Sequence, residues 1–590
     1  MYFEIRETDG IARIGKFTVR NKIVDTPTLF PVVSPFINDI KPKELIADFG
    51  AQCCFTNAYL VYKSNDFKEQ YLSKGVHSML DFDGVIATDS GAFQHFMYGG
   101  DLNIEPSEIE EFQEKINSDC PVILDIPVQF TDPYDEAKRK VEITISRAKE
   151  NLKRRNDPER AWYGPIHGSI YPDLLRKSCE EMSKLDYGIY AIGGVVKSFI
   201  DYRFDVDVQI MLNVKQWLNP SKPLHLFGLG LPSFFAMAVA CGADFFDSAA
   251  YILFAKEGRY FTFSGTKHIS DLLELPCCCP VCSRFSAKEL NELPEKEKTM
   301  QIARHNLYLS YMELKNIKQA IREGTLWELV EQRSTAHPKF LKALKTIRQY
   351  QPFLESMEPR YKTKGIKYLT EYSLYNPTLT KQRRYIAEKH QEYADTLIFI
   401  PELDEPSYTN KTVKDTIDKI IQKIKSKTGS TIDPPDAPRE DLGKYSLSSL
   451  SSDDKELENT EFLPFSQIRS KMAYSLYIVS DIVGLIPYTM ADVYPNSQHE
   501  GNPDIYPGCS LVREHLTAIA TFFERIAKKS QDAKKRVLIY YPVQYINEFG
   551  ENESFLPSNH LIGHISLLAH DFPTMEIRTS IDLDELLKSL

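Results

Sequence analysis

The stretch GADFFDSAAYILFAKEGRY, residues 242–260, places one carboxylate at the end of an apolar segment. Phe245 and Phe246 are typical of a buried strand, Asp247 follows them directly, and three small residues (248–250) leave space in front of it. A carboxylate on an apolar strand is costly unless it has a partner or a chemical task. Two interpretations stay open here: Asp247 caps a helix that begins near Ser248, or it takes part in catalysis.

Other polar groups follow short apolar runs elsewhere in the chain. Asp89, Ser90 and Phe93 lie in TDSGAFQ, Asp125 ends LDIP, and His167 lies in IHGS. The run AIGGVV contains a glycine pair, where the backbone can approach a flat ligand closely. Three acids that each follow a strand, together with glycine-rich turns, indicate an active site more strongly than a set of unrelated helix caps.

A cysteine cluster follows, in LPCCCPVCSRF. Cys277, Cys279 and Cys282 have the spacing C-x-C-x2-C, and His305 lies in ARHNLYL, a segment that reads as helix. Three thiolates and one imidazole can form a closed tetrahedral zinc site, which leaves no open position for catalysis. The sequence therefore predicts one structural Zn2+ per chain, with Cys278 as a bystander. The alternative is free cysteines without a metal.

The elements that would position these residues alternate in type. Short apolar runs, most of them followed by a helix-like stretch, fill the first 255 residues. This rhythm predicts an α/β fold, specifically a (β/α)8 TIM barrel, with a doubly wound open sheet as the alternative. Eight strands are expected, at Thr28–Val33, Cys53–Thr56, Gly84–Thr88, Pro121–Ile126, Ala161–His167, Gly188–Ile192, Pro223–Phe227 and Asp244–Asp247.

Composition limits the class of protein. The chain has 590 residues, of which 42% are hydrophobic and 26% charged, as in an ordinary soluble protein. The net charge of -11 argues against a generally basic nucleic-acid binder, but it allows a local basic face. We expect no signal peptide and no membrane span. Crowded cysteines suit a reducing compartment, so a cytoplasmic enzyme is expected.

Five segments are predicted: a catalytic barrel (1–260), a zinc-binding subdomain (261–335), a basic accessory domain (336–422), a flexible linker (423–460) and a C-terminal α/β accessory domain (461–590). Between Ala336 and His390 there are twelve Lys or Arg and four acidic residues, with tyrosines interleaved. Such a surface suits RNA, although a solvated helical face has the same composition. The linker is rich in serine, proline and charge.

The motifs TDSGAFQ, LDIP, HGSIYPDL, YAIGGVV, HLFGLGLP, FFDSAAYILFAKEGRYFT, CCCPVC and ARHNL resemble, in order and spacing, those of the tRNA-guanine transglycosylases, in their archaeal, archaeosine-type version. The resemblance is specific over residues 1 to about 330 and looser beyond.

The resemblance implies base exchange in tRNA, in which the guanine at position 15 of the D arm is replaced by the 7-deazaguanine precursor preQ0. Asp247 then matches the nucleophile and Asp89 the acid/base. The base pocket matches Ser90, Phe93, Asp125, Gly193, Gly194, Val195 and Val196. The zinc ligands match Cys277, Cys279, Cys282 and His305. A homodimer is also expected from the resemblance.

The sequence departs from the family pattern at two places. His167 stands where the family has a pocket glutamine, and a neutral imidazole presents its donor and its acceptor on opposite edges of the ring. The end of the chain does not read as the tRNA-binding PUA domain, so a separate PUA-domain protein is one possible partner. The alternatives are a paralogue that modifies another base or nucleic acid, and a catalytically silent tRNA-binding subunit.

Overall fold

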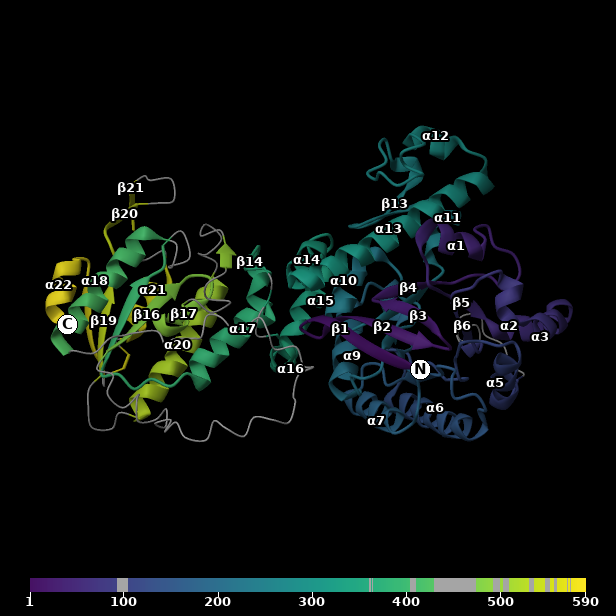
Figure 1. The fold of residues 1–590 in the computed structure, drawn as a ribbon, viewed down its shortest axis with the longest axis horizontal. Coiled ribbons are helices and arrows are strands. Elements are labelled where there is room, and N and C mark those ends of the chain that lie inside the picture. Colours follow the sequence, from purple (N-terminus) through teal and green to yellow (C-terminus); the bar gives the residue numbers. More distant parts are fainter. Residues whose placement is uncertain are drawn as a thin grey trace, which may run out of the picture. The chain divides into compact units, whose positions relative to one another are not determined.

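The computed structural model describes residues 1–92, 104–359, 362, 364–403, 410–428, 474–491, 499–501, 509–529, 535–546, 552–555, 560–569, 571–572 and 575–590. The chain divides into two compact units, Met1–Pro359 and Arg360–Leu590 (Figure 1). Among the described helices, none is long and apolar enough to cross a membrane.

The first unit is a mixed α/β structure built on parallel strands. One sheet has the order β4-β11-β10-β9-β8 and another the order β5-β6-β7. One isolated parallel bridge joins Val32, just after β4, to Phe55 of β5. A second joins Val122, just after β7, to Tyr163 of β8. The strands are β4 (Thr28–Pro31), β5 (Cys53–Asn57), β6 (Val85–Asp89), β7 (Cys120–Pro121), β8 (Tyr163–Ile166), β9 (Ile189–Ile192), β10 (Leu224–Leu226) and β11 (Phe245–Ser248). All eight predicted strands overlap these.

Amphipathic helices connect the strands. In α6, buried Ala137, Val141, Thr144 and Ala148 recur at three- or four-residue spacing and form one apolar face. Proline opens α7 and α10, where a missing N–H costs nothing. The connecting helices are α1 (Pro42–Phe49), α2 (Ala58–Lys63), α3 (Asn65–Leu80), α5 (Pro106–Lys115), α6 (Tyr134–Arg154), α7 (Pro172–Ser183), α8 (Val196–Ile200), α9 (Phe204–Trp217), α10 (Pro232–Ala240) and α11 (Ala250–Lys256).

An antiparallel sheet precedes the parallel strands and was not predicted. It contains β1 (Tyr2–Asp9), β2 (Ala12–Val19) and β3 (Lys22–Thr26). Phe17 of β2 and Val24 of β3 are buried in one cluster with Phe30, Phe55, Tyr163 and Phe245 of the parallel strands. The antiparallel sheet therefore covers part of the core on which the parallel strands pack.

The rest of the first unit is a hairpin and a run of helices. The hairpin is β12 (Arg259–Thr262) with β13 (Gly265–His268), and the helices are α12 (Ala287–Glu292), α13 (Glu295–Glu323), α14 (Leu326–Ser334), α15 (Pro338–Thr346) and α16 (Gln351–Met357). Phe340 of α15 stacks on Phe204 of α9, with ring centroids 4.4 Å apart. Residues 336–359 therefore belong to the first unit, not to a separate basic domain that begins at Ala336.

The second unit is a doubly wound sheet with the order β17-β16-β15-β19-β22. The strands β15 (Thr396–Pro401), β16 (Tyr474–Ser480), β19 (Lys535–Tyr540) and β22 (Met575–Ser580) are parallel, and β17 (Gly484–Pro487) is antiparallel. Ile398 and Ile400 share a cluster with residues of α18 (Lys411–Thr428) and α22 (Leu583–Ser589). Leu397 and Phe399 pack instead with α20 (Cys509–Lys529) and α21 (Leu561–Ala569).

This sheet corrects the predicted division of the C-terminal half. Strand β15, which lies inside the predicted 336–422 domain, pairs in register with β16 and β19 of the predicted 461–590 domain. The two segments therefore form one sheet, not two accessory domains. Helix α18 also continues to Thr428, beyond the predicted start of the linker at Lys423. The remainder of that linker lies outside the described residues.

Candidate active site and metal centre

Asp247 lies in β11, immediately after two buried phenylalanines. Its side chain is 14% exposed, and its Oδ1 accepts a hydrogen bond from the backbone N–H of Gly228 at 2.9 Å. Helix α11 begins at Ala250, and the oxygen that accepts from its first N–H is Ser248 Oγ, at 2.9 Å. Asp247 therefore does not cap this helix. Its carboxylate faces the loop after β10 instead.

Asp89 ends β6 and is held by its neighbour in β5. Asn57 and Asp89 are register partners, and Asn57 Nδ2 donates to Asp89 Oδ2 at 2.7 Å. Asn57 Oδ1 in turn accepts from the N–H of Leu60 at the start of α2. The neighbouring Ser90 is fully buried and donates to the carbonyl of Ile123 at 2.9 Å. Phe93 lies outside the described residues.

Asp125 and His167 form a buried pair. Their side chains meet at 2.6 Å between Oδ2 and Nε2, and both residues are less than a tenth exposed. The Nδ1 atom of His167 has no hydrogen-bond partner among the described residues. The imidazole lies against Gly193, where an added Cβ would fall 2.5 Å from Cε1 of His167. This contact excludes any other residue at 193 unless the imidazole moves.

The backbone after β9 is equally constrained. Gly194 has a φ of +79°, and an added Cβ would lie 2.1 Å from the carbonyl oxygen of Val128. Val195 is buried, and Val196 lies against Gly228, the residue that donates to Asp247. Strands β6 to β11 are parallel to their neighbours, so their carboxyl ends all point in the same direction. Both predicted catalytic acids lie at these carboxyl ends, Asp89 on β6 and Asp247 on β11.

The cysteine cluster forms a four-ligand site. One ligand atom each from Cys277, Cys279, Cys282 and His305 lies within 4.8 Å of the others. The Sγ atoms of Cys279 and Cys282 are 3.5 Å apart, and Cys282 Sγ lies 3.3 Å from His305 Nδ1. With Zn–S bonds of about 2.3 Å, neighbouring ligands of a tetrahedral zinc lie roughly 3.5 to 4 Å apart. The spacing fits a tetrahedral metal ion.

Surrounding groups fix the imidazole of this site. His305 Nε2 lies 2.9 Å from the carbonyl oxygen of Phe261, which can only accept, so the proton is on Nε2 and the lone pair of Nδ1 faces the thiols. Tyr260 stacks on the imidazole, with centroids 3.5 Å apart, and its hydroxyl lies 3.1 Å from Cys282 Sγ. His305 is fully buried. The cluster therefore has the donor set and the supporting contacts of a structural metal site.

The family model described as "Queuine tRNA-ribosyltransferase" matches residues 8–339, more than half of the chain. The chain belongs to this family. A tRNA-guanine(15) transglycosylase of Methanocaldococcus jannaschii is 40% identical over 433 residues, which are 72% of this chain and 65% of that protein. The protein of the same name from Methanococcus maripaludis strain C5 is 43% identical over 392 residues, 65% of this chain and 60% of that protein.

The protein of that name from Thermococcus onnurineus is 40% identical over 395 residues, 67% of each chain. The match thus spans about 60 to 67% of the length of these relatives. The resemblance inferred from the motifs is confirmed at the level of the family.

Sequence reasoning missed three residues of this family member's site. Asn57 holds Asp89, and His225 lies with its Nε2 atom 3.1 Å from Asp247 Oδ1. Tyr163 lies 2.9 Å from the other nitrogen of His225. A histidine inside the apolar strand Pro223–Phe227 was the available signal, because a buried polar side chain requires a partner.

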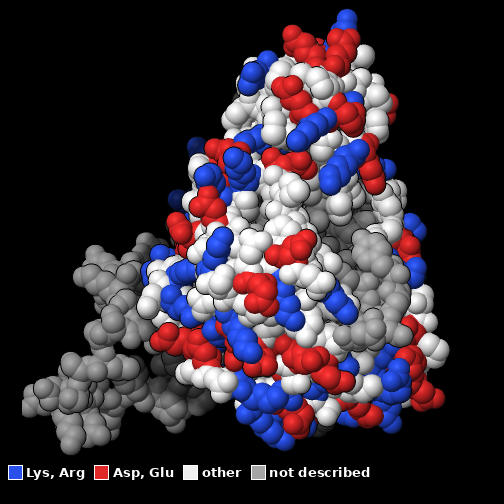
Figure 2. All heavy atoms as spheres, turned by 90° about the vertical axis from the view of Figure 1, so that its right-hand side faces the viewer, with Lys and Arg blue, Asp and Glu red and all other residues white. Residues whose placement is uncertain are grey.

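Charge is mixed on the surface of the first unit. Figure 2 presents the side on which α2, α3 and α5 lie, and there Lys and Arg are interspersed with Asp and Glu. Two members of the predicted basic segment have structural partners. Lys342 pairs with Asp205 at 2.7 Å, and Arg383, which is only 8% exposed, donates to the carbonyl of Leu374. The number of free cations in that segment is therefore smaller than its composition suggests.

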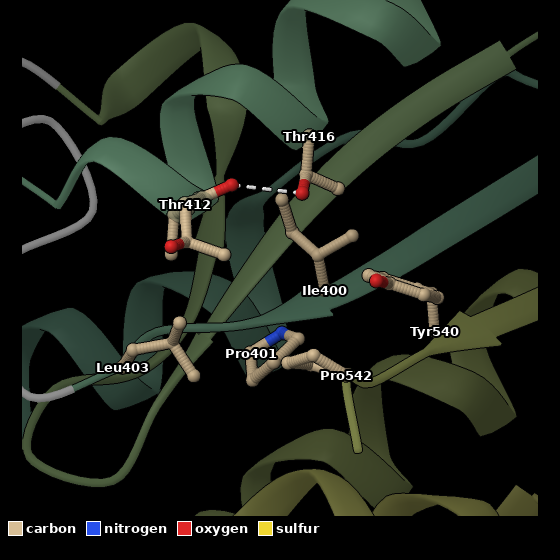
Figure 3. A pocket seen from close by; sticks show the side chains of 8 residues that line it. Ile400, Pro401, Leu403, Thr412, Thr416, Tyr540 and Pro542 are labelled. Atoms are coloured by element: carbon tan, nitrogen blue, oxygen red, sulfur yellow. Dashed lines mark hydrogen bonds between the residues drawn. The ribbon is translucent and has the colours of Figure 1, made fainter. Parts of the chain in front are cut away.

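The second unit has a small, open hollow at the carboxyl ends of β15 and β19 (Figure 3). Its lining is mostly apolar, and the described residues around it include no carboxylate, imidazole or cationic side chain. The residues are Ile400, Pro401, Leu403, Thr412, Val413, Thr416, Tyr540 and Pro542.

Proposed function

We propose that this chain is a tRNA-guanine(15) transglycosylase that exchanges the guanine at position 15 of tRNA for preQ0, a step of archaeosine biosynthesis. The observation that carries the proposal is the pair of acids Asp89 and Asp247. Each lies at the carboxyl end of a parallel strand, where Asp89 accepts from Asn57 Nδ2 and Asp247 accepts from the N–H of Gly228. Carboxylates placed at the carboxyl ends of parallel strands are suited to acid–base and nucleophilic work.

Two displacements at the ribose C1′ account for the exchange. In the first, an oxygen of Asp247 attacks C1′, the bond from C1′ to N9 of guanine breaks, and Asp89 protonates the departing base. In the second, Asp89 accepts a proton from the incoming base, whose nitrogen attacks C1′, and the ester to Asp247 breaks. Retention of configuration requires such a pair of steps. The target base must leave the RNA stack to reach the carboxylate.

The buried pair of Asp125 and His167 suits recognition of the base. Asp125 can accept from an N–H edge, and Nδ1 of His167 remains for a further polar contact. Ser90, Phe93 and the Gly193–Val196 backbone complete the proposed pocket. Because the family has glutamine in place of His167, a related enzyme that acts on another base is the second candidate function.

We further propose that the eight parallel strands close as a (β/α)8 barrel. The two isolated bridges support this, because they link β4 to β5 and β7 to β8 and leave no unpaired edge in the circle. A barrel of this kind carries its active site at the carboxyl ends of its strands. The metal held by the Cys3His cluster is proposed to be one structural Zn2+ per chain, which would hold the 261–335 segment together.

The remaining proposals concern partners and location. A homodimer follows from the family, and a separate PUA-domain protein could supply further grip on the tRNA. The reaction on tRNA and the reduced thiols suit the cytoplasm.

The test is an exchange assay on a tRNA transcript with labelled guanine or labelled preQ0. Wild-type protein should label the transcript, and a transcript with adenine at position 15 should stay unlabelled. Asp247→Asn should abolish a denaturation-stable adduct between protein and tRNA. Asp89→Asn should slow exchange by about 10²- to 10⁴-fold, whereas Asp83→Asn, an exposed acid before the same strand, should not.

Two outcomes would contradict the proposal. If metal-loaded wild-type protein binds tRNA yet incorporates neither base at any tested pH, the chain is not a transglycosylase on this substrate. If Asp247→Asn exchanges label at the wild-type rate, the nucleophile is another group. Incorporation of guanine but not preQ0 would favour the second candidate, with a different incoming base.

A further inference from the structure

His225 is a polar residue at the centre of an aromatic cluster. It lies in β10, is fully buried, and has the rings of Phe30, Phe55, Phe227 and Phe245 within 4.9 to 6.0 Å of its own. A buried imidazole in such surroundings is costly unless both ring nitrogens have a task. The reaction as described above does not use it.

The two nitrogens of His225 face two different groups. Nδ1 lies 2.9 Å from the hydroxyl of Tyr163, which is also fully buried, and Nε2 lies 3.1 Å from Oδ1 of Asp247. The second pair does not meet hydrogen-bond geometry in the free protein. Catalytic hydrogen bonds are often long or poorly aligned before substrate binds, so a small turn of the carboxylate would complete it.

The protonation of this chain of groups follows from burial. Burial raises the pKa of Tyr163 well above its usual range, so the phenol keeps its proton. Burial lowers the pKa of His225 and outweighs the opposite effect of Asp247, so the imidazole is neutral. The carboxylate of Asp247 can only accept, so the single imidazole proton is on Nε2 and faces Asp247. Nδ1 then carries no hydrogen and accepts from the Tyr163 hydroxyl.

The two oxygens of Asp247 consequently differ. Oδ1 accepts from the Gly228 N–H at 2.9 Å and lies 3.1 Å from His225 Nε2. Oδ2 has no protein donor within the part of the chain that the structure describes. We propose that His225, set by Tyr163, is a positioning residue that holds Asp247 through Oδ1, and that Oδ2 is the oxygen that attacks C1′. This inference rests on the proposed transglycosylase function.

A neutral donor suits both displacements. When Oδ2 bonds to C1′ and the bond from C1′ to the base breaks, Oδ1 becomes the carbonyl oxygen of the ester and can still accept from both N–H groups. When the second base attacks, the electron pair returns to the carboxylate and the same two donors stabilise it. No proton moves through His225. A cation in its place would bind the resting carboxylate more strongly and weaken it as a nucleophile.

The kinetic test compares three variants of the His225–Tyr163 pair and one control variant in single-turnover formation of the adduct between protein and tRNA. His225→Phe should slow adduct formation by about 10- to 100-fold, the usual effect of losing a hydrogen bond to a charged group, with KM for tRNA unchanged. His225→Gln, whose Nε2 can replace the donor, should recover most of the rate. Tyr163→Phe should slow adduct formation less, and Tyr187→Phe, which removes a buried hydroxyl elsewhere in the unit, should have no effect.

A second measurement does not depend on turnover. In full-length protein labelled with ¹⁵N-histidine, the signals of His225 are identified by their loss in His225→Gln. They should report a neutral ring protonated at Nε2, and the Nε2–H signal should shift in Asp247→Asn. A ring protonated at Nδ1, or a His225→Phe variant that forms adduct at the wild-type rate, would overturn the inference. If the wild-type protein exchanges no base, the proposed function fails, and the nitrogen signals still decide whether His225 presents a donor to Asp247.

Discussion

Arg13 and Asp244 form a buried ion pair whose loss should destabilise the first unit strongly. Arg13 donates through Nε and one terminal nitrogen to the two oxygens of Asp244, at 2.8 and 2.7 Å, and the side chains are 4% and 0% exposed. It also donates to the carbonyls of Lys222, at 2.7 Å, and Pro220. In Arg13→Met the carboxylate of Asp244 keeps a single described donor, the N–H of Leu224.

The expected loss follows from leaving this charge buried. Removing one partner of a buried pair lowers the free energy of unfolding by about 3 to 5 kcal/mol. The carbonyls of Pro220 and Lys222 also lose their donor, which places the expected loss toward the upper end. Asp244→Asn removes the charge but keeps an oxygen, so the double variant Arg13→Met/Asp244→Asn should lose less than the sum of the single variants. As a control, Arg139→Met breaks an equally bidentate pair with Glu136 on the surface and should cost less than about 1 kcal/mol.

Tryptophan fluorescence during urea unfolding measures this in the full-length chain. The three tryptophans, Trp162, Trp217 and Trp327, all lie in the first unit, so the signal follows that unit alone. A loss below about 1 kcal/mol for Arg13→Met, or additive single variants, would refute the reasoning, because either result would mean that Asp244 is not left as an uncompensated buried charge.

Two further predictions concern the metal centre and the second unit. Cys279→Ser should lower the bound metal well below one ion per chain and reduce the melting temperature, whereas Cys278→Ser, an exposed thiol outside the cluster, should change neither. Metal analysis and thermal unfolding measure both effects, and full metal content in Cys279→Ser would contradict the site. Burial lowers the pKa of His515 to about 3, so between that value and its unfolded value of about 6.5 only the unfolded chain binds the proton. The free energy of unfolding of the second unit should therefore fall by about 2 kcal/mol as the pH is lowered from 6.5 to 5. Hydrogen exchange in β15 measures this fall, and the pH dependence should be absent in His515→Leu.

The parallel strands were predictable because each is a short apolar run bounded by polar turns. The antiparallel sheet before them was not, since seven of the eight residues of β1 are exposed or half-exposed and no apolar run marks this strand. The boundary at Pro359 was missed for a different reason. A run of basic residues suggests a surface, but whether β15 belongs with β16 is decided by pairing across more than seventy residues.

The residues of the candidate site also differ in whether the sequence alone could identify them. The cysteine cluster is local, because three of its ligands lie within six residues and the fourth lies on the helix that follows. The acids Asp89 and Asp247 could be found because each directly follows an apolar strand. Their partners could not, since Asn57 and His225 reach them only through the register of neighbouring strands. Arg13 meets Asp244 from 231 positions away.

Asp244 and Asp247 have different surroundings, although they are close in sequence. Both residues lie on the same short segment, three positions apart. Asp244 is fully buried, and the guanidinium of Arg13 binds both of its oxygens, so its carboxylate is out of reach of a substrate. Asp247 remains partly exposed, and the donors that the structure describes around it are neutral. Under the proposed function, the position of the cation, not the residue type, distinguishes the nucleophilic carboxylate from the structural one. A cation introduced at position 225 should abolish that difference.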